Sequence, residues 1–530
     1  MTSLDLAATD IAGTDIAGTD LAVTDFAVTA AAHPDPAFPR FHPRPAKGWI
    51  NDPNGVSHID GRYHVFFQYN PESARHHRIA WGHVSSADLV RWEQHPVALR
   101  PQDGGPDEFG CWTGVVTDDG GVPTAAYSGV RGDGGHSQVV ISRGSADLVD
   151  WTQDGHVAAS MPADPQVTAV RDPFIFRFQG KRYAMQGAGL ASGHAALLLY
   201  TVEDLSDWKY QGIWLTSENP VAAVHTPAEI WECPQLVRVP AGSGSDAWVM
   251  MFSLWLSGDQ HEHVNGVGHL IGSLAEDPST GLPVFSPQTG GKSDLGRDFY
   301  APQILQLQDG AAEPAGPAGP AEPAEPAEPA EPVGPAEQAA PKALLWGWAN
   351  EGPGRDGRRG RSQAEIDAAG WAGVLTHPRV LSVEDGALAM APAPEVDSYR
   401  GAQVAVRAGG DVVLPPFAEA VVTAGAVVTA GAATAATTRS GGPDPLAADA
   451  VVELSLVNGG GPGASRQVVF SGTVGPGEEL RVFVDASLVE VYRTGSVATT
   501  LRAYPAAGER WVLQLPAGAA ADVWRLEQPA

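Results

Sequence analysis

Apolar and polar residues alternate in short runs along this chain. The segments that begin at Glu232 ("ECPQLVRV") and Ala301 ("APQILQLQDG") both place Pro-Gln before such a run. Beyond about residue 390 the runs become "VVELSLV", "RQVVFSG", "LRVFVDASLVEVY" and "RWVLQLP". Alternation with a period of two is typical of strands with one buried face, and "RVFVDASLVEVY" indicates a half-buried strand pair of a sandwich. The pattern predicts a protein built mainly from strands.

Turn residues divide these runs into repeated units of about 60 residues. The string Asp-Leu-x-x-Trp begins at Asp88, Asp147 and Asp204. The segments from Asn51 and Arg171 each carry Asp-Pro, then apolar residues, a Gly, a basic residue and Tyr, which predicts strand, tight turn and strand. The units start near positions 52, 113, 172, 232 and 301. Five such units predict an all-β fold, a five-bladed β-propeller followed by a C-terminal β-sandwich.

Biased segments suggest the domain boundaries. Residues 1–36 carry a five-residue repeat ("LAATDIAGTD") that fits neither a helix nor a strand, so we expect a disordered tail. Residues 37–392 are the predicted propeller, with a Pro/Glu/Ala-rich insertion at about 311–341 in a hairpin loop of the fifth unit. Residues 393–530 are the predicted sandwich, with an Ala/Thr/Gly-rich loop at about 421–448.

Charge and composition exclude several classes of function. The formal net charge of −29 argues against a nucleic-acid partner and disfavours strongly anionic substrates, unless a local Arg or Lys pocket overrides the overall field. No stretch reaches the apolar length of a membrane span, so we expect no membrane partner.

Two cysteines provide neither a disulfide framework nor a zinc-finger spacing, and "HEH" at His261 to His263 lacks the spacing of a helical metal site. We therefore expect no metal and no cofactor. The first residues lack the features of a secretory signal, which predicts a cytoplasmic protein.

Three acidic residues lie at or near the start of their units: Asp52, Asp172 and Glu232. First strands of propeller blades line the central channel, so these carboxylates are expected to converge at one mouth. Two nearby carboxylates in different environments suit glycoside hydrolysis, because their interaction separates their pKa values. Taken alone, Asp52 is better explained as a residue that holds its own turn, and the same explanation is nearly as strong for Asp172. Aromatic neighbours that could stack on sugar favour the catalytic interpretation: Trp49, Trp81, Trp112 and Trp231.

The motifs "WINDPNG", "FFQYNP", "WGH", "RDP", "WECPQL", "DFYAPQ" and "FVDASLVEVY" occur in this order. The series resembles that of glycoside hydrolase family 32, the β-fructofuranosidases, from about His42 to the end of the chain. The resemblance implies a five-bladed propeller followed by a β-sandwich, in agreement with the repeat count. It also implies a retaining exo-β-fructosidase that releases terminal fructofuranosyl units from sucrose or short fructo-oligosaccharides.

By this resemblance Asp52 is expected to be the nucleophile and Glu232 the acid/base. Asp172 is expected to bond fructose hydroxyls and support the transition state. Contacts with the sugar are expected from Asn51, Gln68, Trp81, Trp112, Thr113 and Arg171. The second-blade motif, often Phe-Ser-Gly-Ser in the family, is here "CWTGV", where Val115 replaces the last Ser.

Three alternatives remain open on the sequence. A sucrose-6-phosphate hydrolase would need a basic contact for the phosphate, and a fructosyltransferase would pass the fructosyl group to a sugar hydroxyl. A fructan-binding propeller without activity is disfavoured because all three acids are present. The expected partner is a small carbohydrate, and the sequence carries no signal for the oligomeric state.

Overall fold

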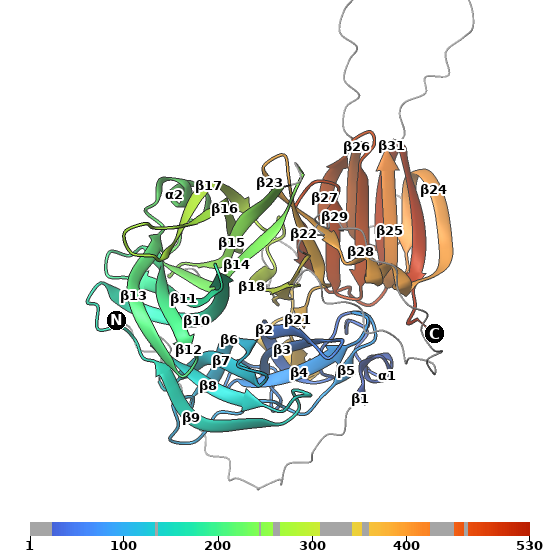
Figure 1. Ribbon diagram of the computed structural model, residues 1–530. Coiled ribbons are helices and arrows are strands. Elements are labelled where there is room, and N and C mark those ends of the chain that lie inside the picture. The colour runs from blue at the N-terminus through green and yellow to red at the C-terminus, as the bar shows by residue number, and fades with distance from the viewer. Residues whose placement is uncertain are drawn as a thin grey trace, which may run out of the picture.

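The computed structural model describes residues 24–132, 136–242, 245–257, 265–307, 342–351, 360–424, 450–459 and 465–529. Figure 1 shows the strands of the propeller arranged around an axis, with a sandwich of red and orange strands beside them. The Pro/Glu/Ala-rich insertion at about 311–341 and the "HEH" segment lie outside the described residues.

Each of the first four blades is antiparallel, and its strands follow one another in chain order. The first blade contains β2 (Gly48–Ile59), β3 (Arg62–Asn70), β4 (Ala80–Ser86) and β5 (Glu93–Gln94). The second contains β6 (Gly110–Asp118), β7 (Pro123–Val130), β8 (Ser137–Gly144) and β9 (Trp151–Ala159). The third contains β10 (Val167–Phe178), β11 (Lys181–Leu190), β12 (Ala195–Asp204) and β13 (Asp207–Thr216). The fourth contains β14 (Ile230–Ala241), β15 (Ser245–Trp255), β16 (Val267–Glu276) and β17 (Pro283–Lys292).

The fifth blade closes the propeller. It contains β18 (Phe299–Gln306), β19 (Ala343–Ala349), β21 (Val374–Leu375), β22 (Arg379–Glu384) and β23 (Ala387–Pro392). The short β20 (Trp371–Ala372) pairs with β2 of the first blade, so a late segment joins the sheet of the earliest one. The first strands contact one another in a ring, β2 with β6, β6 with β10, β10 with β14, β14 with β18 and β18 with β2. This ring places the start of all five units around one channel.

The sandwich contains β24 (Arg400–Leu414), β25 (Phe417–Ala424), β26 (Ala450–Asn458), β27 (Ser465–Val474), β28 (Glu479–Asp485), β29 (Leu488–Arg493), β30 (Thr499–Arg502) and β31 (Glu509–Leu526). The long β31 belongs to both layers, because its first part pairs with β26 and its last part with β25. Pro516 and Gly518 lie between these two parts, and the φ of +90° at Gly518 suits a residue without Cβ. The predicted class, an all-β propeller followed by a sandwich, is confirmed.

Helices are few and short: α1 (Phe26–Ala31), α2 (Pro220–His225), α3 (Gln363–Ala369) and the 3₁₀ helix η2 (Pro394–Tyr399). Among the described residues, no helix is long and apolar enough to cross a membrane.

Two predicted irregular segments are partly ordered. The tail expected over residues 1–36 is wrong for its last part, because β1 (Thr24–Asp25) pairs with β5 and α1 follows it. Phe26 and Ala30 lie one helical turn apart and are 3% and 1% exposed, so burial of this face orders the last copies of the repeat. The loop expected over 421–448 also begins later, because residues up to Ala424 belong to β25 and pair with β28 and β31. The remaining parts, 1–23 and 425–449, lie outside the described residues.

Candidate active site

The five first strands carry a β-bulge at the same place. The pairing of each first strand with the next strand shifts between Ile50 and Pro53, Cys111 and Gly114, Arg171 and Phe174, Glu232 and Gln235, and Tyr300 and Gln303. Within these shifts the residue that directly precedes a Pro or Gly is Asp52, Thr113, Asp172, Cys233 or Ala301; the first two are the second residue of their shift and the last three are the first. The last three have φ of +58°, +49° and +50°, a backbone that side chains rarely adopt. The bulges therefore present one residue from each blade at a common level of the channel.

Asp52 is held by four neighbouring donors. Its Oδ2 accepts hydrogen bonds from Gln68 Nε2 at 2.9 Å and from Thr113 Oγ1 at 2.5 Å, and the Cys233 thiol lies 3.5 Å away. Its Oδ1 accepts from Asn51 Nδ2 at 3.2 Å. Gln68 also donates to Thr113, and Asn51 donates to Gln68, so the donors position one another. This network fixes the orientation of the carboxylate.

Asp172 lies across the same thiol from Asp52. The Cys233 Sγ is 3.6 Å from Asp172 Oδ2, and the Cys233 backbone N–H donates to that oxygen at 2.9 Å. The Asp172 backbone N–H donates to Ser128 Oγ at 2.7 Å, which supports the left-handed backbone at the bulge. One sulfur atom thus contacts carboxylates from the first and third blades.

Glu232 precedes the bulge of the fourth blade by one position. Its Oε2 accepts a hydrogen bond from the Tyr300 hydroxyl at 2.7 Å, and its Oε1 is 3.6 Å from Arg171 Nε. The Glu232 side chain is 14% exposed, whereas Arg171 is 11% exposed. A carboxyl flanked by a hydroxyl donor and a cation, and still open to solvent, is suited to exchange a proton with a bound substrate.

Burial raises the pKa of both aspartates. The pKa of Asp52 is raised to about 6 by burial and by the charge of Glu232, against hydrogen bonds from Thr113 and Cys233 that lower it. Burial, with the charges of Glu232 and Asp52, raises the pKa of Asp172 to about 8. Burial also raises the pKa of the Cys233 thiol, which keeps it a neutral donor. The site thus holds carboxyl groups with separated pKa values.

The structure brings most of the predicted residues together and corrects two aromatic ones. Trp81 is completely buried and donates from Nε1 to the Trp112 carbonyl at 3.0 Å, so it cannot form the expected wall of the sugar pocket. Trp231 is also completely buried and stacks on Phe252. Both rings belong to the apolar core between strands. The motif alone does not reveal which face of a strand is covered by other parts of the protein.

Partly exposed rings lie at the channel mouth instead. Trp49 and Trp112 are half-buried, and the His76 ring lies edge-on to both, with ring centroids 6.3 and 5.8 Å away. Sugar contacts from Asn51, Gln68, Thr113 and Arg171 stay predictions.

Sequence reasoning missed four supporting residues: Ser128, Cys233 as a bridging donor, Ala301 and Tyr300. A signal was present in the chain, since "NDP", "WTG", "RDP", "ECP" and "YAP" align with one another on their last residue, a Pro or a Gly. That alignment places Cys233, rather than Glu232, in line with the two aspartates in sequence.

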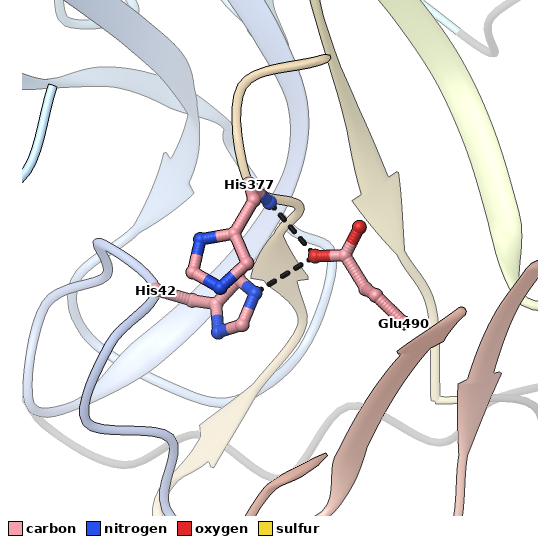
Figure 2. Close-up of side chains that lie close together, drawn as sticks. All are labelled: His42, His377 and Glu490. Atoms are coloured by element: carbon pink, nitrogen blue, oxygen red, sulfur yellow. Dashed lines mark hydrogen bonds and ion pairs between the residues drawn. The ribbon is translucent and has the colours of Figure 1, made fainter. Parts of the chain in front are cut away.

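A second cluster of polar side chains lies between the propeller and the sandwich. Figure 2 shows His42 and His377 on one oxygen of Glu490, which accepts hydrogen bonds from His42 Nε2 and the His377 backbone N–H, both at 2.8 Å. His42 Nδ1 is 2.7 Å from Asp485 Oδ2, and Arg379 binds the other Glu490 oxygen at 2.6 Å. The three side chains lie close enough to hold a metal ion. The adjacent guanidinium, and carboxylates on both nitrogens of His42, instead make this an ionic network.

Comparison with known proteins places this geometry in a family. Residues 42–317 match the model of the glycosyl hydrolases family 32 N-terminal domain, which is more than half of the chain. A sucrose-6-phosphate hydrolase of Zymomonas mobilis is 30% identical over 378 residues, covering 68% of this chain and 63% of that protein. A raffinose invertase of Escherichia coli is 29% identical over 372 residues, covering 68% and 66%. The chain belongs to glycosyl hydrolase family 32.

Solved structures agree on the fold over nearly the whole chain. The Bombyx mori β-fructofuranosidase matches with a TM-score of 0.67 and 23% identity, covering 95% of this chain and 97% of that one. The sucrose-6-phosphate hydrolase of Lactobacillus gasseri matches with a TM-score of 0.66 and 19% identity, covering 95% and 96%. At these identities the likeness establishes the architecture and not the substrate.

Proposed function

We propose that this protein is a retaining glycoside hydrolase that releases terminal β-D-fructofuranosyl units from sucrose or short fructo-oligosaccharides. The observation that carries the proposal is the convergence of Asp52, Asp172 and Glu232 from three blades. Cys233 lies within 3.6 Å of both aspartates, so these two carboxylates share one small volume. The hydrogen-bond donors around the two carboxylates hold them in place before substrate binds. Electrostatic stabilisation of a transition state requires groups that are positioned in advance.

In this mechanism Asp52 attacks the anomeric C2 of the fructosyl unit. Its Oδ2 is occupied by Gln68 and Thr113, whereas Oδ1 accepts only from Asn51 among the described residues. Oδ1 is therefore the oxygen we assign to the new C–O bond. Glu232 gives its proton to the departing oxygen and later takes one from the incoming water.

Asp172 does not react in this mechanism. Its raised pKa allows the carboxyl to bond sugar hydroxyls, as a hydrogen-bond acceptor when ionised or as a hydrogen-bond donor when protonated. Cys233 positions Asp172 through the backbone N–H and Asp52 through the thiol. No step in this scheme is assigned to a cofactor.

The test is release of fructose by the wild-type protein and by two variants. Asp52→Ala removes the nucleophile and is expected to abolish turnover of sucrose. Glu232→Gln keeps the size of the side chain and is expected to slow turnover at least a hundredfold. Near wild-type activity in Asp52→Ala would refute the assignment. Fructose measured on sucrose, inulin and levan would identify the preferred chain length.

Fructosyl transfer is an alternative outcome of the same covalent intermediate. Products analysed at high sucrose concentration separate the two reactions, because accumulating kestose-like oligomers would contradict simple hydrolysis. The partner in either case is a small carbohydrate. The cytoplasmic location expected from the sequence stays a prediction.

A further inference from the structure

Two tryptophans are linked to the proposed nucleophile, one through each of its carboxylate oxygens. Trp49 donates from Nε1 to Asn51 Oδ1 at 3.1 Å, and Asn51 donates to Asp52 Oδ1 at 3.2 Å. Trp112 directly precedes Thr113, whose hydroxyl donates to Asp52 Oδ2 at 2.5 Å. Both indoles are half-buried, so part of each ring stays open at the channel mouth. Indole rings of the first two blades therefore border the way from solvent to Asp52.

Trp49 also lies next to the residues that hold the proposed acid/base. Its ring packs against a buried apolar cluster that includes Cys233, Tyr300 and Trp348, and the Trp348 ring centroid is 5.8 Å away. The Tyr300 hydroxyl donates to Glu232, which protonates the departing oxygen in the proposed reaction. Because the departing oxygen must face Glu232, we expect the leaving sugar of a bound substrate beside Trp49.

His76 is the polar ring at this place. Its centroid is 6.3 Å from that of Trp49 and 5.8 Å from that of Trp112, edge-on to both. The residue is exposed, and no other side chain of the described residues hydrogen-bonds to its ring. Desolvation by the surrounding residues, with the charge of His77, lowers the pKa of His76 to about 4. The neutral imidazole offers one donor and one acceptor, and a sugar hydroxyl can pair with either.

The loop that carries His76 is fixed on both sides of it. Before it, Asn70 Nδ2 donates to the Arg75 carbonyl at 2.8 Å. After it, the Cys111 N–H of the second blade donates to the Ile79 carbonyl at 2.7 Å. These contacts hold the backbone of the loop against the first two blades. A group on a fixed loop suits recognition of a ligand, because binding then costs less ordering entropy.

We propose that His76 determines specificity for the leaving sugar, through a hydrogen bond between its imidazole and a hydroxyl of the hexose next to the cleaved bond. This inference rests on the proposed function. The two indoles offer apolar contact that any sugar face can use. The imidazole instead selects by the presence and position of a hydroxyl, because a site built for a hydrogen bond rejects a ligand that lacks the partner. His76 takes no part in breaking the bond.

The test compares sucrose with methyl β-D-fructofuranoside, whose leaving group is methanol and carries no second sugar. His76→Phe keeps a ring and removes both nitrogens. It should lower the ratio of kcat/KM for sucrose to kcat/KM for the methyl fructoside by about tenfold. His76→Gln keeps a donor and an acceptor and should restore part of this ratio. The matched control is His77→Gln, a change at the exposed neighbour, which should leave the ratio within about twofold of wild type.

Each result is decisive. If His76→Phe slows both substrates to the same extent, or neither, the ring does not recognise the leaving sugar and the inference is wrong. A higher ratio in His76→Phe would show that the ring is an apolar wall, which also overturns it. A ratio in His76→Gln as low as that in His76→Phe would exclude a hydrogen bond as the cause. If the wild-type protein releases no fructose from either substrate, the proposed function itself fails.

Discussion

Thr113 controls the charge of the proposed nucleophile. Its hydroxyl donates to Asp52 Oδ2 at 2.5 Å, and this bond lowers the pKa of Asp52 against the stronger effect of burial. The nucleophile must be ionised, so the proposed activity should fall as the pH drops through about 6, the pKa of Asp52. The residue that stands where the family often has Ser thus keeps the hydroxyl function.

Replacing Thr113 by Val keeps the shape and removes the donor. The pKa of Asp52 should then rise, because its charged form loses a hydrogen bond, and the acid limb of kcat/KM should move to higher pH by about one unit. Thr113→Ser retains the donor and is the control. The measurement is the pH dependence of fructose release, and an unmoved acid limb in Thr113→Val would contradict this role.

Asp172 in its ionised form should lower the stability of the folded protein. Its pKa is raised from 3.8 in the unfolded chain to about 8, so the stability that the protonated form contributes is present below pH 4 and lost as the pH rises through 8. Asp172→Asn removes the charge and keeps an oxygen for the Cys233 N–H. The free energy of unfolding should rise by up to about 6 kcal/mol above pH 8 and stay unchanged below pH 4. Denaturant unfolding at both values of pH measures this. A variant less stable than wild type at pH 8 would show that burial does not penalise the charge.

At the scale of elements, the bulges of the first strands build the site. Each bulge interrupts strand pairing, and at two of them a serine from another blade accepts the freed backbone N–H. Ser128 accepts that of Asp172 at 2.7 Å, and Ser253 accepts that of Ala301 at 2.9 Å. Both serines are completely buried, so no solvent can replace them. Adjacent blades are thereby locked in register at the level of the carboxylates.

Ser128→Ala tests this arrangement, because it leaves the buried N–H of Asp172 without its acceptor. The free energy of unfolding should fall by about 1–3 kcal/mol, and kcat should fall with it because Asp172 is displaced. The control is Ser455→Ala in β26, where the buried hydroxyl has no hydrogen-bond partner among the described residues. That variant should change stability by less than about 0.5 kcal/mol and leave kcat intact. Equal effects of the two variants would show that Ser128 does not hold the adjacent blades in register.

At the scale of the whole molecule, charged residues join the propeller to the sandwich. Arg379 of β22 binds Glu490 of β29 at 2.6 Å and Asp294 at 2.7 Å, and all three side chains are buried. Against the effect of burial, Arg379 and His42 hold the pKa of Glu490 well below its usual range. Burial lowers the pKa of His42, but the hydrogen bonds that its ring donates to Asp485 and Glu490 outweigh burial, so the pKa is raised. Around this network the two parts share one apolar core, which includes Phe41, Leu381 and Phe483.

The signs of these shifts define a pH window. The lowered pKa of Glu490 stabilises the fold above pH 4.5, and this contribution is lost as the pH falls. The raised pKa of His42 stabilises the fold below pH 6.5, and this contribution is lost as the pH rises through the folded value. The interface should therefore be most stable in mildly acidic solution.

Glu490→Gln removes the buried negative charge that binds Arg379 and His42. It should lower the free energy of unfolding by about 3 kcal/mol at pH 6 and remove the loss of stability toward acid. Arg466→Gln, which breaks the exposed pair with Asp411, is the control and should cost less than about 1 kcal/mol. Thermal unfolding across pH 4–8 measures both. A cost for Glu490→Gln no larger than the control would show that the interface is held by apolar packing alone.

The chain by itself determined the class of fold and singled out three acids as candidates for the site. Strand alternation, turn residues and the repeat of about 60 residues are local properties, and each unit carries them independently of the others. The Asp-Pro turns at Asp52 and Asp172 could be recognised in the sequence, because a bulge requires turn-forming residues at its own position in the chain. The resemblance to a family then followed from seven motifs in order.

Tertiary structure alone decided which side chains these residues contact. Cys233 bridges two carboxylates and Tyr300 binds Glu232 only because blades that are distant in sequence meet around the channel. The sequence predicted Trp81 as a sugar contact, but its ring lies in the apolar core. Burial of a ring depends on which residues of the other blades cover it. The end of the predicted tail is ordered because Phe26 and Ala30 find a buried site in the folded protein. Such contacts join segments far apart in the chain, so no local pattern can encode them.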